Sequence, residues 1–273
     1  MFKKLLYLLR LLALVVGAGC GAKNGAGAQT AAKPEAKPVA ASQEAAPQKT
    51  TTVIKLMDGT KYATPAYIYK SAKPGPAVLV VGGVHGNEPA GALAAKKFCD
   101  VPLLKGTLIV VPRANETALQ EKIRTLPETG DLNRAYPGKE KGTPAEQLTY
   151  GIVKLMKENQ VAMVLDLHEG YAFNYENHKS VGESILPGTD DKSTFLAMDA
   201  IEFINKQITE PKKKFNVLAN HVKGSTAWYA NTVLKVPAFT IETSDKQPLE
   251  DRTNFSFTIA KFIIANGTGI IAQ

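Results

Sequence analysis

Two histidines and one glutamate have the residue types and the spacing of a metal site. His85 and Glu88 lie three positions apart in the sequence VHGNEPAG, and His168 lies in the sequence LDLHEG. Two imidazoles and one carboxylate leave one position of a tetrahedral Zn²⁺ open. An open position is typical of a catalytic ion rather than a structural one. We therefore expect one zinc ion, bound by these three side chains, in a hydrolytic site.

Runs of apolar residues precede the candidate residues and predict the strands that position them. These runs cover residues 77–81, 161–167 and 238–241. His85, His168 and a further acid, Glu242, follow the three runs. Continuous apolar runs of this length are typical of strands buried on both faces. Because active sites of open α/β sheets gather at the carboxyl ends of strands, we expect the three residues to meet at one edge of a sheet.

Strand and helix patterns alternate through the rest of residues 51–273. Further strands are expected at residues 52–56, 61–69 and 108–112, and helices at residues 88–100, 144–159, 194–206 and 250–265. This alternation favours a single α/β domain with a central mixed, largely parallel sheet flanked by helices.

Residues 1–50 have the composition of an export signal and a linker. Residues 1–20 begin with lysines, continue with a short apolar run and end in Gly-Ala-Gly-Cys, which is the order of a secretory signal. Cys20 resembles the lipidated cysteine of a bacterial lipoprotein, and plain signal cleavage after Ala28 is the alternative. Residues 21–50 hold few large apolar residues and predict a flexible linker. We expect an exported protein, either anchored to a membrane through a lipid on Cys20 or secreted.

The net charge of +8 arises largely within residues 1–50, where basic residues outnumber acidic ones. A basic balance of this origin is weak evidence for nucleic-acid binding. The chain also lacks the interleaved basic and aromatic residues that are typical of RNA-binding segments. We therefore expect no nucleic-acid partner, and the sequence does not indicate an oligomeric state.

Four short motifs, in this order, resemble those of the zinc carboxypeptidase superfamily, and most closely its succinylglutamate desuccinylase/aspartoacylase branch. The motifs are HGNE at His85, DLNR at Asp131, DLH at His168 and TIET at Glu242. The resemblance extends from the strand before His85 to Glu242. It implies the fold of these zinc hydrolases, with His85, Glu88 and His168 as the ligands of the metal.

The resemblance also implies the residues of the reaction. Glu242 is expected to be the general base, which takes a proton from the attacking water and returns it to the leaving amine. Glu169 is the rival base, but alternation along a strand directs its side chain away from that of His168. Arg124 is expected to stabilise the oxyanion of the scissile carbonyl, and Arg113 is the competing candidate for this role.

Recognition of the substrate is expected to involve a carboxylate. Asn133 and Arg134 match the family residues that bind this group, and the planar fork of arginine suits bidentate binding. Asp131 matches the aspartate that orients a ligand histidine. The substrate-contacting tyrosine of the family has no clear counterpart, and Tyr171 and Tyr229 are the candidates.

These residues predict an exported zinc hydrolase that cleaves an amide bond in an N-acyl amino acid or short peptide with a free carboxylate. Ala227 stands where true carboxypeptidases usually carry an acidic residue, which argues against ordinary peptide specificity. The alternative is a zinc carboxypeptidase acting on peptides, with cell-wall peptides as one possible substrate. A lipoprotein that captures a ligand without catalysis is a third hypothesis.

Overall fold

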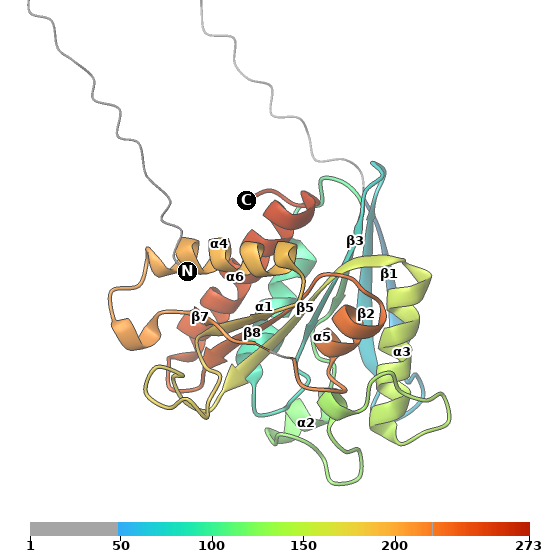
Figure 1. Cartoon of the computed structure of the whole chain (residues 1–273). Coiled ribbons are helices and arrows are strands. Elements are labelled where there is room, and N and C mark those ends of the chain that lie inside the picture. Colours follow the sequence, from blue (N-terminus) through green and yellow to red (C-terminus); the bar gives the residue numbers. More distant parts are fainter. Residues whose placement is uncertain (1–48, 220) are drawn as a thin grey trace, which may run out of the picture. The chain divides into compact units, whose positions relative to one another are not determined.

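The computed structural model describes residues 49–219 and 221–273, which form one eight-stranded sheet covered by helices (Figure 1). The predicted leader at residues 1–20, with Cys20, lies outside the described residues, as does nearly all of the predicted linker at residues 21–50. The first strand begins at Lys49, slightly before the expected start of the catalytic domain.

The strands are β1 (Lys49–Leu56), β2 (Thr64–Ser71), β3 (Ala77–Gly82), β4 (Thr107–Val111), β5 (Val161–Gly170), β6 (Ser184–Pro187), β7 (Asn216–Val217) and β8 (Ala238–Ser244). The helices are α1 (Pro89–Lys97), α2 (Glu116–Glu121), α3 (Pro144–Glu158), α4 (Asp191–Asn205), α5 (Thr226–Trp228) and α6 (Leu249–Thr268). Short 3-10 segments lie at Phe98–Asp100, Leu132–Arg134 and Pro211–Lys213, and a π-helical turn lies at Tyr229–Val233.

The sheet has the order β1-β2-β4-β3-β5-β8-β6-β7. Its central strands β4, β3, β5 and β8 pair in parallel, and so do β6 and β7. The pairs β1–β2, β2–β4 and β6–β8 are antiparallel. The predicted α/β class, with a mixed and largely parallel central sheet flanked by helices, is confirmed.

The central strands are apolar throughout because both of their faces are buried. In β3, Val78 and Val80 pack in a core beneath α1, α4 and α6, whereas Leu79 and Val81 pack in a second core beneath α3. Figure 1 shows α1, α4 and α6 together on one side of the sheet and α3 and α5 on the other. Strands buried on both sides read as continuous apolar runs, which is why the sequence reveals them so clearly.

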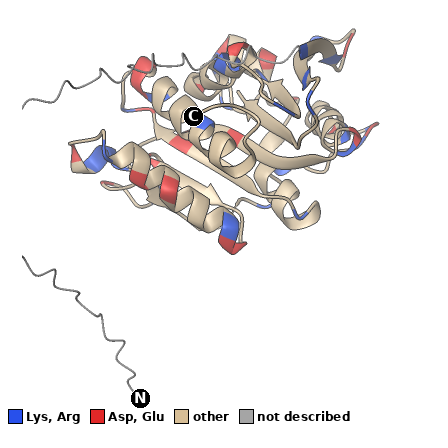
Figure 2. Ribbon diagram, turned by 90° about the horizontal axis from the view of Figure 1, so that it is seen from above, with Lys and Arg blue, Asp and Glu red and all other residues tan. Residues whose placement is uncertain are grey.

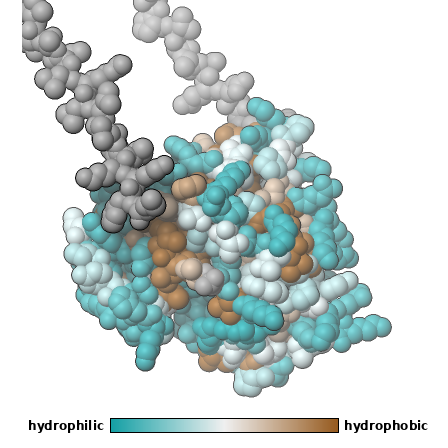
Figure 3. Space-filling model, in the orientation of Figure 1, coloured by the Kyte–Doolittle hydropathy of each residue, from teal (hydrophilic) through white to brown (hydrophobic). Residues whose placement is uncertain are grey.

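Charged residues lie mainly on the helices and loops around the sheet, where acidic and basic positions are intermixed along the ribbon (Figure 2). On the face shown in Figure 3, hydrophobic residues form small groups between hydrophilic ones. Among the described residues, no helix combines the length and the apolar character needed to span a bilayer.

The two strands that carry His168 and Glu242 extend beyond their predicted ends. The apolar runs predict that these strands stop just before the two residues, but β5 continues to Gly170 and β8 to Ser244. His168 lies opposite Glu242 in the register of β5 and β8, and Ser184 of β6 lies opposite Glu242 on its other side. Glu242 is thus paired on both sides and His168 on one, so both residues are held by strands rather than loops.

Some elements have no counterpart in the sequence-based prediction. Strands β6 and β7 and helix α2 are too short for hydrophobic periodicity to indicate them. Strand β2 begins later than the predicted residue 61, because the connection after β1 closes through two successive turns. In these turns the amides of Thr60 and Ala63 donate to the carbonyl oxygens of Met57 and Thr60, at 3.2 Å each.

Two glycines bring the start of α1 directly onto the sheet. A Cβ atom at Gly91 would lie 2.2 Å from the carbonyl oxygen of Leu167, and a Cβ atom at Gly82 would lie 2.3 Å from the carbonyl oxygen of Gly91. Clashes with backbone atoms cannot be relieved by rotating a side chain. The close packing of α1 on β3 and β5 therefore places Glu88, the residue before α1, next to His168.

Substituting Gly91 tests this packing. Gly91→Ala is expected to lower the free energy of unfolding by about 1–3 kcal/mol, the usual cost of overpacking. Gly151→Ala in α3 is the matched control, because its Cβ would meet only the end of the Leu56 side chain, at 3.2 Å. The control should gain up to about 1 kcal/mol from helix propensity. Urea denaturation measures both variants, and a Gly91→Ala protein as stable as the wild type would contradict the close packing.

Candidate active site

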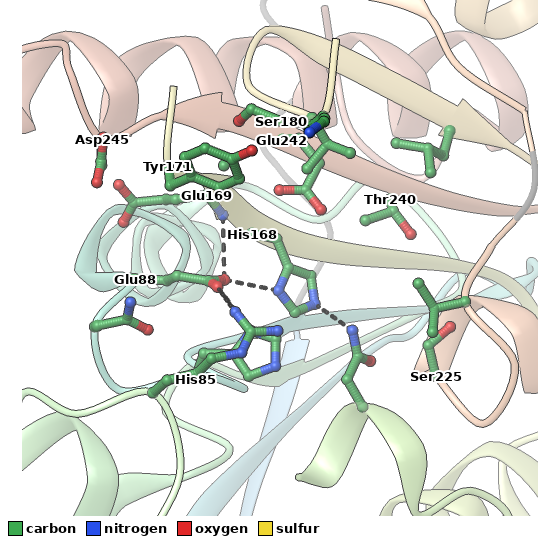
Figure 4. Close-up of a pocket in the computed structure, with 18 of the residues that line it drawn as sticks. His85, Glu88, His168, Glu169, Tyr171, Ser180, Ser225, Thr240, Glu242 and Asp245 are labelled. Carbon is green, nitrogen blue, oxygen red and sulfur yellow. Dashed lines mark hydrogen bonds and ion pairs between the residues drawn. The ribbon is translucent and has the colours of Figure 1, made fainter. Parts of the chain in front are cut away.

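His85, Glu88 and His168 meet at one buried point and form what we term the ligand triad (Figure 4). Nδ1 of His85 lies 2.7 Å from Oε1 of Glu88, and Nδ1 of His168 lies 2.8 Å from Oε2 of Glu88. Ligand atoms of all three residues lie within 4.8 Å of one another. Two imidazole nitrogens and a carboxylate oxygen suit a divalent ion such as Zn²⁺. The triad could therefore hold one metal ion.

Three different elements deliver the triad. The chain leaves β3 through Gly83, whose φ of +67° is in the left-handed region, and reaches His85 two residues later. Glu88 is the residue before Pro89, which opens α1. His168 lies in β5, and the amide of the following residue, Glu169, donates to Oε2 of Glu88 at 3.2 Å.

The outer nitrogens of the two histidines each face a carboxylate. Nε2 of His85 lies 3.2 Å from Oδ1 of Asp131, and Nε2 of His168 lies 3.2 Å from Oδ1 of Asp166. Carboxylates in this position fix the orientation of a ligand imidazole and raise its basicity. The structure therefore places Asp131 where the resemblance implies it. It also adds Asp166, which the D-x-H spacing could have indicated, because alternate residues of a strand share a face.

Charge in the triad is balanced by close contacts. Burial opposes ionisation of Glu88, but the charges and hydrogen bonds of His168 and His85 outweigh it and hold the pKa of this carboxyl below its usual range. Burial likewise opposes ionisation of Asp131, but the hydrogen bond with His85 lowers its pKa to about 2. Both acids are therefore ionised at neutral pH, which is the state that a cation site requires.

Glu242 faces the triad from β8, and Figure 4 shows its carboxyl group directed toward the side of the pocket occupied by His168. Its side chain is buried, with 9% of the residue exposed, and its Oε2 has no hydrogen-bond partner within the described part of the chain. Burial raises the pKa of Glu242 to about 8, although the charge of His168 opposes this shift. A buried carboxyl group with a free oxygen beside the triad is placed to exchange a proton with a molecule in the cavity.

The rival base, Glu169, is engaged elsewhere. Its carboxylate accepts a hydrogen bond from the amide of Ala90 at 2.6 Å and forms an ion pair with Arg252 at 2.5 Å. These contacts tie β5 to the helices α1 and α6. Glu242, rather than Glu169, therefore has the free carboxyl oxygen that a general base needs.

The structure brings one of the two candidate oxyanion arginines to the site. Nη1 of Arg124 donates to Oε1 of Glu88 at 2.9 Å, and its half-exposed side chain lines the cavity. Arg113 instead donates to both carboxylate oxygens of Glu116, at 2.6 and 3.0 Å. Only Arg124 lies where a reacting carbonyl group could be stabilised.

The predicted carboxylate-binding pair also lines the cavity. Nη1 of Arg134 donates to the carbonyl oxygen of Asn133 at 2.8 Å, and half of the Arg134 side chain is exposed. Asn133 is buried, and its Nδ2 lies 3.4 Å from Nε2 of His168. Both residues thus line the cavity beside the triad, where a substrate carboxylate could reach them.

The cavity itself has a volume of about 420 Å³. The exposed Tyr171 lines it, whereas Tyr229 is buried and packs near the ring of Tyr136, with 6.2 Å between the ring centroids. Tyr171 is therefore the tyrosine available to a substrate. His221 lies in a loop and is half-buried, with Nδ1 3.2 Å from the hydroxyl of Thr240.

Comparison with known proteins identifies the family of this chain. A family model described as the succinylglutamate desuccinylase/aspartoacylase catalytic domain matches residues 74–254. The N-alpha-acetyl-L-2,4-diaminobutyric acid deacetylase of Halomonas elongata is 34% identical over 100 residues, which are 35% of this chain and 29% of that protein.

Solved structures share the fold. A variant of the cell shape determinant protein Csd4 from Helicobacter pylori is 25% identical with a TM-score of 0.64, and the match covers 72% of this chain and 52% of Csd4. An aspartoacylase family protein from Mesorhizobium loti is 19% identical with a TM-score of 0.61, over 83% of this chain and 69% of that protein. This chain thus spans about half of Csd4 and 29% of the deacetylase. The family expected from the motifs is confirmed, and the chain belongs to the succinylglutamate desuccinylase/aspartoacylase family of the zinc carboxypeptidase-like superfamily.

Proposed function

We propose that this protein is an exported zinc-dependent hydrolase that cleaves an amide bond in a substrate with a free carboxylate. The observation that carries the proposal is the buried carboxyl group of Glu242, which faces the ligand triad across a cavity shared with Arg124 and Arg134. The site would thus combine a metal-binding triad, a general base and two arginine side chains.

Each group has a distinct task in amide hydrolysis. A bound zinc ion would supply Lewis acidity to the site. Glu242 would take the proton of the attacking water and pass it to the leaving amine, a task that suits its position in the cavity and its unpartnered oxygen. Arg124 would stabilise the negative charge that develops on the carbonyl oxygen. Arg134 and Asn133 would hold the substrate carboxylate and so fix the scissile bond in place.

The names of the relatives support an amide bond as the target. The Halomonas elongata protein is a deacetylase, and Csd4 is described as a D,L-carboxypeptidase, with structures bound to mDAP and to a tripeptide. A cavity of about 420 Å³ has room for an N-acyl amino acid or for the end of a short peptide.

A zinc carboxypeptidase acting on peptides, cell-wall peptides among them, is the alternative, and the similarity to Csd4 favours it. Assaying N-acetyl and N-succinyl amino acids beside N-blocked dipeptides separates the two functions. Turnover of the dipeptides alone would favour the carboxypeptidase. Ligand capture without catalysis is a weaker hypothesis, because it gives no role to the Glu242 carboxyl.

Export is part of the proposal because of the sequence of residues 1–20, which has the basic start and short apolar run of a secretory signal. Lipidation at Cys20 would anchor the protein to a membrane, and cleavage after Ala28 would release it. In both cases the hydrolase would meet its substrate outside the cytoplasm.

Glu88 is the residue whose loss should abolish metal binding. Glu88→Gln removes the negative charge shared by the two histidines, and zinc affinity is expected to fall by at least about 100-fold. Bound zinc is measured by elemental analysis after loading and dialysis. His178→Ala is the control, because this exposed histidine lies outside the triad. The assignment of the ligands is wrong if Glu88→Gln retains as much zinc as the control.

Substitution of Glu242 should separate metal binding from catalysis. Glu242→Gln keeps the shape of the side chain but cannot accept a proton, so kcat is expected to fall by about 10²–10⁴-fold with the zinc content unchanged. The exposed Glu250→Gln on α6 is the control and should keep wild-type kinetics. Unchanged turnover in Glu242→Gln would remove this residue from the mechanism.

Arg134 should determine the requirement for a free carboxylate. Arg134→Ala is expected to raise KM by about 10–100-fold for a free-carboxylate substrate and to have little effect on its amidated analogue. Arg113→Ala is the matched control, because Arg113 pairs with Glu116. If the two substrates lose activity equally in Arg134→Ala, the carboxylate binds elsewhere.

A further inference from the structure

One wall of the cavity comes from residues 171–182, the segment that connects β5 to β6, which we term the wall segment. Tyr171, Lys179, Ser180 and Val181 of this segment line the cavity, and Figure 4 shows Tyr171 and Ser180 beside Glu242 and Glu169. The position of the wall segment therefore determines the width of the cavity in front of the triad.

Hydrogen bonds within the wall segment give it a fixed shape. The hydroxyl of Ser180 donates to the carbonyl oxygen of Ala172 at 2.7 Å and accepts from the amide of Ala172 at 2.9 Å. Nδ2 of Asn174 donates to the carbonyl oxygen of Ser180 at 2.7 Å, and the amide of Asn174 donates to the carbonyl oxygen of Gly182 at 2.9 Å. These bonds hold the segment in one shape, and its placement depends on its attachment to the sheet.

Glu183 provides one attachment to the sheet, and Asn216 of β7 provides another. Its Oε1 accepts hydrogen bonds from the amide of Ser244 at 2.9 Å and from Nε2 of Gln247 at 2.6 Å. Ser244 lies two residues after Glu242 in β8, and the residue after Glu183, Ser184, is opposite Glu242 in the register of β6 and β8. One carboxyl group therefore connects the end of the wall segment to the strand that carries the proposed base.

The burial and the backbone conformation of Glu183 are both unfavourable for the stability of the folded chain. The residue is 1% exposed, its Oε2 has no hydrogen-bond partner in the described chain, and burial raises its pKa to about 7 in spite of the bonds from Ser244 and Gln247. Its φ of +56° is also unfavourable for a residue with a Cβ atom. An apolar residue would avoid the burial cost but would leave two buried donors unpaired. The acid therefore fits a positioning role rather than a packing role.

We propose that Glu183 is a positioning residue for the amide hydrolysis proposed above: it holds the wall segment at a fixed distance from Glu242 and thereby sets the fit of the substrate. This inference rests on the proposed function for its kinetic consequence. The attachment itself is a property of the folded chain and can be tested without turnover.

Two substitutions at Glu183 distinguish the effect of its hydrogen-bond acceptor from the effect of its negative charge. Glu183→Gln keeps Oε1 as an acceptor for both donors, whereas Glu183→Ala removes it. Glu183→Ala is expected to raise KM by about tenfold, with kcat changed less than about threefold, because the wall contacts the substrate and not the transferred proton. Glu183→Gln should restore KM to near the wild-type value, and zinc content should be unchanged in both variants.

Amide hydrogen exchange of the zinc-loaded protein provides the readout that is independent of activity. Peptides covering residues 171–182 are expected to exchange faster in Glu183→Ala than in the wild type or in Glu183→Gln. Asp190→Ala is the matched control for lost stability, since Asp190 caps α4 through bonds to the amide and hydroxyl of Ser193, at 2.9 and 2.7 Å. The control should leave exchange in the wall segment unchanged.

The outcomes distinguish the two proposals. Wild-type exchange and KM in Glu183→Ala would overturn the positioning role, and so would equal impairment of the Gln and Ala variants. If Glu183→Ala does not fold, Gln247→Ala removes one of the two donors and should shift exchange in the same direction, and an unchanged wall segment in that variant would also overturn the inference. A wild-type protein without turnover would refute the proposed function, while exchange would still decide the role of Glu183.

Discussion

The carboxylate of Glu88 is the interaction on which the site depends. Its two oxygens contact the two triad histidines, one of which follows β3 while the other lies within β5, and Arg124 donates to it from a third segment. A buried carboxylate is stable only when it is paired and hydrogen-bonded. Without Glu88, two buried imidazoles would face each other with no shared negative charge. The convergence of these groups creates a point at which a divalent cation could be held by all three side chains.

The fold makes this convergence possible by bringing a helix start against the sheet. Gly91 and Gly82 remove the side chains that would otherwise hold α1 away from β3 and β5. The carboxylate of Glu88 then lies at the amino end of α1, where the helix dipole favours negative charge. The parallel register of β5 and β8 places Glu242 directly opposite His168. The register of β5 and β8 therefore sets the spacing of His168 and Glu242.

The sequence predicts the centre of this protein better than its edges. The core strands are recognisable because they are buried on both faces, and the triad is recognisable because polar residues follow those apolar runs. The ends of β5 and β8 were mispredicted for the same reason, since pairing continues through the polar residues His168 and Glu242. Strands β6 and β7, at the edge of the sheet, are too short to leave a pattern.

The sequence alone also could not assign a role where two residues of the same type were candidates for it. Arg124 and Arg113 are both plausible in sequence, and only their hydrogen bonds to Glu88 and Glu116 show which of them faces the cavity. Glu183 carries no motif at all. Its position before a short strand gives no sign that it bonds to residues far along the chain, because such pairing is set by the register of β6 and β8.

X-ray absorption spectroscopy of the zinc-loaded protein tests the central claim most directly, because it reports the atoms bound to the ion. We expect a first shell of nitrogen and oxygen at about 2.0–2.2 Å, with the multiple scattering of two imidazole rings. A shell without imidazole scattering, or one that contains sulfur, would contradict the assignment of His85, Glu88 and His168 as the ligands.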